Sequence, residues 1–103
     1  MIAFKILTAG QWVRFQADGV FSGAPVDLAD GYIHLSTAEQ LDETLARHFQ
    51  GQVGLVIATV DLDLLGNALK WEVSRGGALF PHYYGVLSMS AVTAASPVVA
   101  RDE

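Results

Sequence analysis

The sequence contains no cysteine among its 103 residues. Disulfide frameworks, thiolate zinc sites and cysteine nucleophiles are therefore excluded for this stretch of chain. The first residues also lack the basic segment and the apolar run of a secretory signal. We therefore expect a cytoplasmic protein.

Basic residues are scarce as well, because six Lys and Arg stand against eleven Asp and Glu, for a net charge of −5. A broad nucleic-acid interface needs a basic surface, so we expect no nucleic-acid partner. No apolar stretch is long enough to span a bilayer, so we expect no membrane partner. The composition still allows a small phosphorylated ligand that is held by one or two arginines.

Apolar residues are plentiful, at 51% of the chain against 17% charged residues. The chain can therefore bury a real core, and its length fits a single domain over residues 1–103. The patterns predict an α+β fold with a mixed, largely antiparallel sheet and two helices. Strands are expected at residues 1–7, 32–36, 54–60, 69–74 and, once or twice, 86–99, with the apolar run at 54–60 as the central strand. Helices are expected at 8–17, where Thr8 and Gln11 fit a capping box, and at 37–49. Residues 61–67 are expected to form a turn or a single helical turn, residues 19–31 and 75–85 to be loops, and residues 101–103 to be a frayed tail.

The segment 30–37, Asp-Gly-Tyr-Ile-His-Leu-Ser-Thr, is the first candidate for function. Alternation along a strand places Tyr32, His34 and Ser36 on one face and turns the apolar residues between them to a core. Residues 36–39 fit a capping box that opens the next helix. A histidine beside a helix N-terminus suits chemistry on a phosphate or a ribose. The alternative is a histidine that is hydrogen-bonded only within the fold.

The segment 71–85, Trp-Glu-Val-Ser-Arg-Gly-Gly-Ala-Leu-Phe-Pro-His-Tyr-Tyr-Gly, is the second candidate. Two successive glycines let the backbone turn tightly or approach a ligand closely. Loops carry binding residues more often than other elements do. The alternative is an ordered crossover whose aromatic side chains pack on the sheet.

The two segments together supply a set of chemical groups. Histidine can act as general acid or base, arginine can hold a phosphate, and tyrosine suits a flat ring such as nicotinamide or adenine. A carboxylate can orient a ribose hydroxyl or stabilise a developing positive charge. The candidate catalytic residues are His34, Ser36, Glu72, Arg75 and His82. The candidate ligand-binding residues are Tyr32, Thr37, Gly76, Gly77, Tyr83 and Tyr84.

Three other chemistries compete for these residues. A two-histidine phosphoesterase carries two strand motifs of the form His-x-Ser/Thr; residues 34–36 fit one, whereas residues 82–84 do not fit the second. A metal site could use His34, His82 and Glu72. However, no pair of histidines is closely spaced in the sequence, so we expect no metal. A Ser-His-acid triad lacks the Gly-x-Ser-x-Gly elbow.

Residues 30–40, Asp-Gly-Tyr-Ile-His-Leu-Ser-Thr-Ala-Glu-Gln, and residues 71–85 together resemble a small bacterial family of domains of unknown function, numbered nine-five-two in that series. The resemblance covers nearly the whole chain. That family is similar in fold to the ADP-ribosyltransferase superfamily, which binds NAD in a cleft of a split, mainly antiparallel sheet. The resemblance therefore implies a split sheet of this kind.

The resemblance also implies roles for individual residues. His34 would hold a ribose hydroxyl of NAD, and Ser36 would lie near the nicotinamide ribose. Tyr83 or Tyr84 would stack on nicotinamide, and Glu72, Arg75 or His82 would drive the transfer. Leu35 stands where the superfamily usually has a small residue, and no late glutamate matches in position. These departures favour a non-catalytic module as the alternative.

We therefore expect a protein that binds NAD, ADP-ribose or a related nucleotide, with possible glycosidic or phosphoryl-group transfer. NAD would be its substrate or ligand, no other cofactor is implied, and the sequence does not identify a protein acceptor. The alternatives are a non-catalytic ligand-binding or protein-interaction module, a phosphoesterase that uses His34 and His82, and a purely structural domain.

Overall fold

Two three-stranded sheets, one two-stranded sheet and three α-helices make up the described part of the chain. The structure is a computed structural model that describes residues 1–98, except for the side chain of Arg75. The tail expected at 101–103, and the end of the strand region expected at 86–99, lie outside these residues. Every strand pair is antiparallel. The α+β class is confirmed, and the expectation of a mixed sheet is wrong for the described residues.

The first sheet has the order β1–β4–β8. Its strands are β1 (Ile2–Leu7), β4 (Val56–Asp61) and β8 (Val92–Pro97). The apolar run at 54–60 thus forms the central strand, as predicted. Pro97 lies at the end of an edge strand, where its missing N–H is tolerated.

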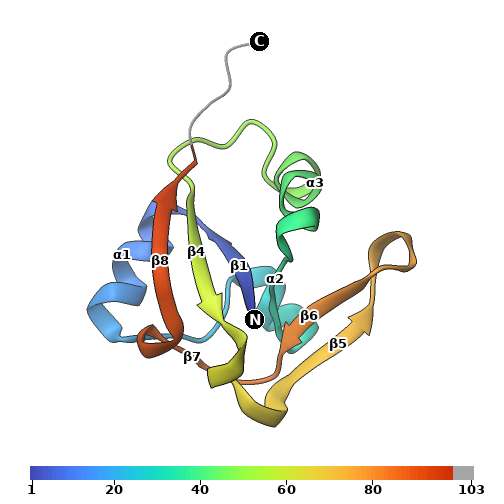
Figure 1. Cartoon of the computed structure of the whole chain (residues 1–103). Helices are drawn as coiled ribbons and strands as arrows, with labels where there is room; N and C mark the ends of the chain where they lie inside the picture. Colours follow the sequence, from blue (N-terminus) through green and yellow to red (C-terminus); the bar gives the residue numbers. More distant parts are fainter. Residues whose placement is uncertain (99–103) are drawn as a thin grey trace.

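The second sheet has the order β3–β6–β5. Its strands are β3 (Ile33–His34), β5 (Leu69–Val73) and β6 (Leu79–Tyr83), and a separate short pair joins β2 (Val20–Phe21) to β7 (Leu87–Ser88). Phe4 and Ser36 link the two three-stranded sheets through paired backbone bonds of 2.8 and 2.9 Å. From this point β5 and β6 project away from the first sheet (Figure 1).

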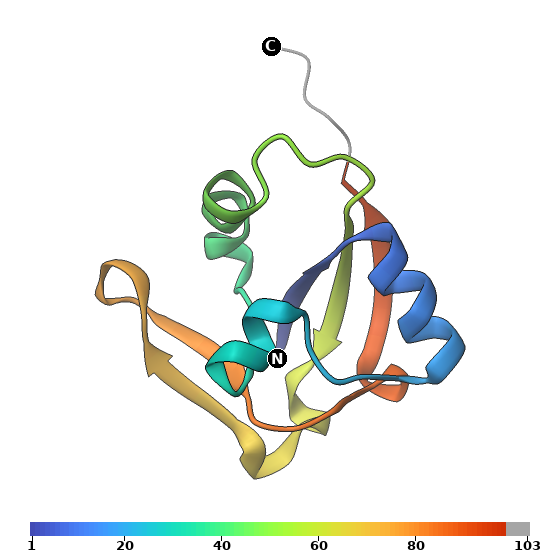
Figure 2. The same ribbon diagram turned by 180° about the vertical axis from the view of Figure 1, so that it is seen from behind.

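Two helices lie on opposite sides of the first sheet, as both views show (Figures 1 and 2). α1 (Ala9–Asp18) begins with the predicted capping box, in which Gln11 N–H donates to Thr8 Oγ1 at 3.1 Å. It buries Phe15 in the core. α3 (Ala38–His48) begins one residue later than the predicted box, because Thr37 N–H donates to Gln40 Oε1 and Ser36 is turned to Thr44 instead.

A third helix, α2 (Pro25–Asp30), lies within the segment that we predicted as a loop. Its apolar Val26 and Leu28 are exposed, whereas Asp27 is its buried residue. Because the apolar side chains are exposed and the charged one is buried, apolar periodicity does not indicate this helix. Gly31, at φ 88°, then turns the chain sharply into β3.

The segment 75–85 is also not a loop throughout. β6 occupies residues 79–83, whereas the turn at Arg75–Gly77, Ala78 and residues 84–85 lie outside the strands. Pro81 fits in β6 because it lies opposite Trp71, at a position where the ladder with β5 uses no N–H donor. On its other side, the Pro81 carbonyl accepts from Leu35 N–H at 3.1 Å.

The core joins both sheets to α1. Short 3₁₀ turns at Leu62–Leu64 and Gly66–Ala68 connect β4 to β5, as expected from the turn-like sequence there, and another lies at Met89–Ala91. None of the described helices is long and apolar enough to cross a membrane. The buried apolar cluster consists of Ala3, Leu7, Phe15, Phe21, Ile33, Leu35, Ala58, Val60, Leu62, Leu65, Leu87 and Ala91.

Candidate active site

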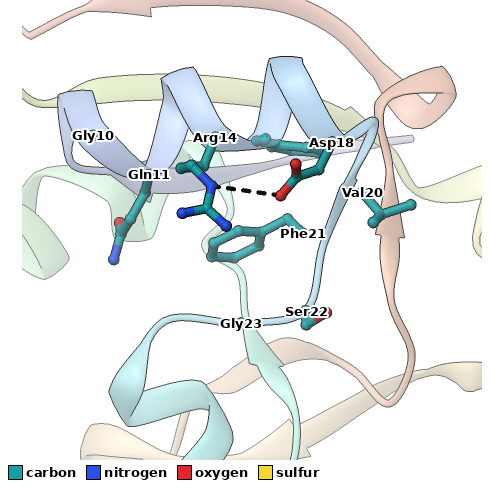
Figure 3. Close-up of a pocket in the computed structure, with 9 residues that line it drawn as sticks. Gly10, Gln11, Arg14, Asp18, Val20, Phe21, Ser22 and Gly23 are labelled. Atoms are coloured by element: carbon teal, nitrogen blue, oxygen red, sulfur yellow. Dashed lines mark ion pairs between the residues drawn. The ribbon is translucent and has the colours of Figure 1, made fainter.

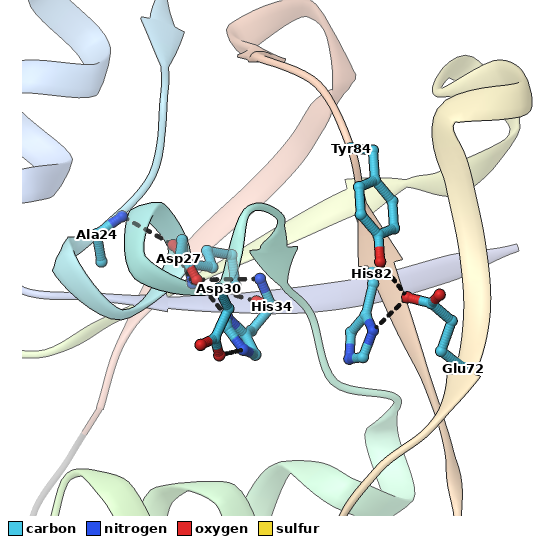
Figure 4. A network of polar contacts seen from close by, with 8 residues as sticks. Ala24, Asp27, Asp30, His34, Glu72, His82 and Tyr84 are labelled. Carbon is cyan, nitrogen blue, oxygen red and sulfur yellow. Dashed lines mark hydrogen bonds and ion pairs between the residues drawn. The ribbon is translucent and has the colours of Figure 1, made fainter.

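His82, in the middle of β6, is held by a carboxylate from the neighbouring strand. Its Nδ1 lies 2.8 Å from Glu72 Oε1, and the Tyr84 hydroxyl donates to the same oxygen at 2.7 Å (Figure 4). These bonds from Tyr84 and His82 lower the pKa of Glu72, and the bond to Glu72 raises the pKa of Tyr84 to about 12. Glu72 is therefore an ionised acceptor, and Nδ1 of His82 carries the hydrogen.

The other ring nitrogen of His82 has no hydrogen-bond partner among the described residues. His82 is nevertheless only 3% exposed, and it lines a cavity of about 750 Å³. Figure 4 shows this nitrogen turned away from Glu72. A neutral imidazole that is oriented by a carboxylate and offers a bare Nε2 is the arrangement that a general base requires.

His34, on β3, lies directly opposite His82 in the strand register, with 5.7 Å between the ring centroids. Both of its nitrogens face carboxylates: Nδ1 lies 2.6 Å from Asp27 Oδ1, and Nε2 lies 2.9 Å from Asp30 Oδ2. Each ring nitrogen of His34 therefore has a carboxylate oxygen within hydrogen-bonding distance. His82 differs, because one of its ring nitrogens has no partner among the described residues.

Asp27 anchors this arrangement from inside the protein, where it is 1% exposed. Besides His34, it accepts from Ala24 N–H at 2.8 Å and pairs with the buried Lys5 ammonium at 2.9 Å. Burial alone would raise the pKa of Asp27, but the His34 bond and the Lys5 charge outweigh it and hold the pKa at about 2. Burial lowers the pKa of Lys5, and Asp27 opposes that effect.

The depressed pKa of Asp27 predicts a loss of stability in acid. The ordinary value is 3.8 and the folded value is about 2, so this carboxylate stabilises the fold above pH 3.8. Its contribution is lost as the pH falls through about 2. We expect the ¹³C shift of the Asp27 carboxyl to titrate with a midpoint near 2. A midpoint at or above 3.8 would contradict the assigned contacts.

Tyr32 lies between the two histidines. Its ring stacks on His82 at a centroid distance of 4.0 Å and an interplanar angle of 26°, and lies 4.6 Å from His34. Tyr84 is tilted against it at 5.2 Å. Burial, followed by the charges of Asp30 and Glu72, raises the pKa of Tyr32. The hydroxyl therefore stays protonated, and the rings form an aromatic wall.

The cavity runs along β1 between α3 and the second sheet. His34, His82 and Asp30 lie at one end, and Arg47, His48 and Gln52 line the other. A second groove, of about 520 Å³, lies between α1 and β2 (Figure 3). There the Arg14–Asp18 ion pair, 3.6 Å long, lies above Phe21. That groove is separate from the histidines.

The structure brings five of the candidates together: Tyr32, His34, Glu72, His82 and Tyr84. Ser36 lines the cavity, but its hydroxyl bonds to Thr44 at 3.0 Å. Thr37 caps α3.

Three other candidates lie away from the cluster. Tyr83 packs against the core on the opposite face of β6. Gly76 and Gly77 form the exposed hairpin tip, with φ of 69° and 81°. The side chain of Arg75 lies outside the described part of the structure.

The sequence patterns did not indicate three residues of the site, Lys5, Asp27 and Asp30. A lysine in an otherwise apolar strand was the available signal, because a buried ammonium needs a carboxylate partner. The described residues contain no group of three or more side chains that could hold a metal ion.

The bond between His82 and Glu72 predicts a tautomer that ¹⁵N spectroscopy can detect. The neutral ring of His82 should carry its hydrogen on Nδ1, which donates to Glu72. Glu72→Gln should remove the tautomer preference of His82 and leave His34 unchanged. Hydrogen on Nε2 of His82 in the parent protein would contradict the proton assignment.

A family model described as "Protein of unknown function (DUF952)" matches residues 6–95. The chain belongs to this family. The resemblance inferred from the two segments is thereby confirmed, whereas the likeness to ADP-ribosyltransferases stays a prediction. No curated protein sequence shows significant similarity to the chain.

Solved structures of a related protein show the same fold. The crystal structure of protein CC0527 from Caulobacter crescentus is 49% identical, with a TM-score of 0.91, and the match covers 94% of this chain and 85% of that one. Its solution structure is 50% identical, with a TM-score of 0.83, and the match covers 93% and 83%. Both are structural-genomics targets, so the similarity establishes the fold and not an activity.

Proposed function

We propose that the cavity binds a nucleotide-like ligand such as NAD or ADP-ribose, and that His82 acts on it as a general base. The observation that carries this proposal is the buried His82, whose Nδ1 is held by Glu72 while Nε2 faces the cavity without a described partner. A cavity volume of about 750 Å³ lies in the range of small-molecule and cofactor sites.

The histidine end of the cavity suits a flat, electron-poor ring. Tyr32 lines the cavity there, Tyr84 is tilted against it, and the carboxylates of Asp30 and Glu72 lie beside these rings. Negative groups favour a cationic ring, such as nicotinamide in NAD, and a sugar carbon that gains positive charge as its bond to that ring breaks. An anionic phosphate is disfavoured at this end.

The opposite end suits the anionic part of such a ligand. Arg47 lines the cavity there and uses its Nε for Glu43 at 3.1 Å, so further guanidinium N–H groups remain as donors. From Lys5 to Thr8, the end of β1 and the residue that follows it span roughly 10 Å of the cavity wall. A ligand with a ring at one end and phosphates farther along fits this polarity.

The reaction supported by these groups is transfer or hydrolysis at an N-glycosidic bond. An acceptor hydroxyl or water would form a new bond to the sugar carbon and pass its proton to Nε2 of His82. The carbon–nitrogen bond to nicotinamide would break, with its electron pair leaving on neutral nicotinamide. Glu72 would stabilise the imidazolium that forms on His82.

Two alternative functions use the same cavity. A phosphoesterase needs both histidines to meet a phosphate, but each ring nitrogen of His34 already faces a carboxylate. A non-catalytic module would bind the ligand and release no nicotinamide. The geometry therefore favours the glycosidic reaction over the phosphoesterase, and turnover separates it from the binding module.

Titration calorimetry of the full chain with NAD, ADP-ribose, nicotinamide and a nucleoside cyclic phosphate tests the proposal. We expect saturable binding of NAD or ADP-ribose, weakened about tenfold by Tyr32→Leu through loss of stacking. Tyr83→Phe is the matched control, because that tyrosine lies on the opposite face of β6. Binding of the cyclic phosphate alone would favour the phosphoesterase, and no binding of any of the four would refute the proposal.

A further inference from the structure

The outer edge of β5 is uncovered. β5 is the last strand in the order β3–β6–β5, and it is outermost in both views (Figures 1 and 2). Trp71, Val73 and Leu79 are 37%, 69% and 52% exposed, and the strand register places them together on the hairpin face away from His82. An open edge with apolar side chains is a surface on which another strand can pair.

The hydrogen-bond pattern fixes which backbone groups point outward. Ser74 N–H donates to the carbonyl of Ala78, and Tyr84 N–H donates to the carbonyl of Ala68. The backbone N–H and C=O groups of the even-numbered residues of β5 therefore point toward β6. The N–H and C=O groups of Trp71 and Val73 therefore point to the open edge. Leu69 offers its carbonyl there, because its N–H already donates to Gly66.

We propose that two copies of this chain pair through β5, antiparallel and centred on Trp71. In this register Trp71 exchanges both backbone bonds with its counterpart, and Val73 N–H donates to Leu69 of the other copy. Lys70 of each copy then lies directly opposite Glu72 of the other. The strand is thus self-complementary in backbone bonds, apolar contacts and charge.

Charge selects this register over its neighbours. A register centred on Lys70 or on Glu72 would set identical charges directly opposite each other, whereas the register centred on Trp71 sets opposite charges there. Lys70 has no ion pair among the described residues. Glu72 uses Oε1 for both His82 and Tyr84, which leaves Oε2 for a lysine of the second copy. The ammonium group of Lys70 in the second copy would thereby lie beside the Glu72 carboxylate, which orients His82.

Sedimentation equilibrium from micromolar to millimolar concentration tests the pairing. The parent chain should dimerise. Lys70→Glu and Glu72→Lys should each raise the dissociation constant at least about tenfold, because each homodimer would set like charges opposite one another twice. An equimolar mixture of the two variants should dimerise again, because every charged pair is then of opposite sign.

Two further variants serve as a charge control and as an independent test of the pairing. Arg14→Glu, on exposed α1, makes the same change of net charge as Lys70→Glu and should leave dimerisation intact. Trp71→Lys should abolish it without altering Glu72, which keeps the test valid should Glu72→Lys fail to fold. A monomeric parent chain, single variants that dimerise like the parent, or a mixture of folded variants that stays monomeric would each overturn the proposal.

Discussion

Replacing Asp27 with asparagine is expected to destabilise the fold by about 3–5 kcal/mol. The carboxylate is buried, and it pairs with Lys5 at 2.9 Å and with His34 at 2.6 Å. Asparagine keeps the size but removes the charge, so the buried ammonium of Lys5 is left without a counter-ion. The three segments that meet there, β1, α2 and β3, would lose their common anchor.

Urea unfolding followed by circular dichroism measures this effect, and Asp30→Asn provides a matched control. Asp30 also contacts His34, at 2.9 Å, but its side chain is 46% exposed. Exposed ion pairs contribute about 0–1 kcal/mol, so that variant should stay near the parent. Equal losses of stability in the two variants would show that Asp27 is not the anchor.

The second large effect is expected at His82. His82→Gln should lower nicotinamide release from NAD by about 10²–10⁴-fold, the usual contribution of a general acid or base. NAD affinity should change far less, because the glutamine keeps a polar group at the cavity wall. Tyr83→Phe, on the opposite face of β6, is the matched control and should retain the parent rate.

Chromatographic measurement of nicotinamide, with a calorimetric check of binding, separates the outcomes. A parent protein that binds NAD without releasing nicotinamide is a binding module, and the catalytic role of His82 is then wrong. A His82→Gln variant that turns over at the parent rate would place the base elsewhere.

Local patterns were sufficient to predict much of the fold. Alternation at 32–36 correctly placed Ile33 and Leu35 in the core. The capping pattern at Thr8 and Gln11 located the start of α1. Each of these signals depends on neighbours within a few residues, which is why the sequence alone reveals them.

Features that depend on distant partners were not predictable in this way. Asp27 is buried on α2 because it meets Lys5, which is 22 residues away in the chain. Without that partner, its position in a loop-like sequence suggests only a solvated turn. The β6 strand was missed for a similar reason, since Pro81 argues for a loop unless the register opposite Trp71 is known.

In the candidate site, too, some features could be predicted from local patterns and others depend on distant partners. His34, Glu72 and His82 were correctly grouped, because two polar segments at strand ends can meet in a small domain. Their hydrogen-bond partners were not predictable, since these depend on which carboxylate faces which ring nitrogen in the folded chain. Tyr83 and Tyr84 were equivalent in the sequence, and only the pairing of β6 shows that Tyr83 faces the core and Tyr84 faces Glu72.

An amide-shift titration of ¹⁵N-labelled protein with ADP-ribose and NAD would show whether the cavity binds these ligands. We expect saturable shifts at Tyr32–His34 and His82, along the cavity wall from Lys5 to Thr8, and around Arg47 in α3, whereas the second groove beside Phe21 should be unaffected. Shifts confined to the second groove, or spectra that neither ligand changes, would refute binding in the cavity.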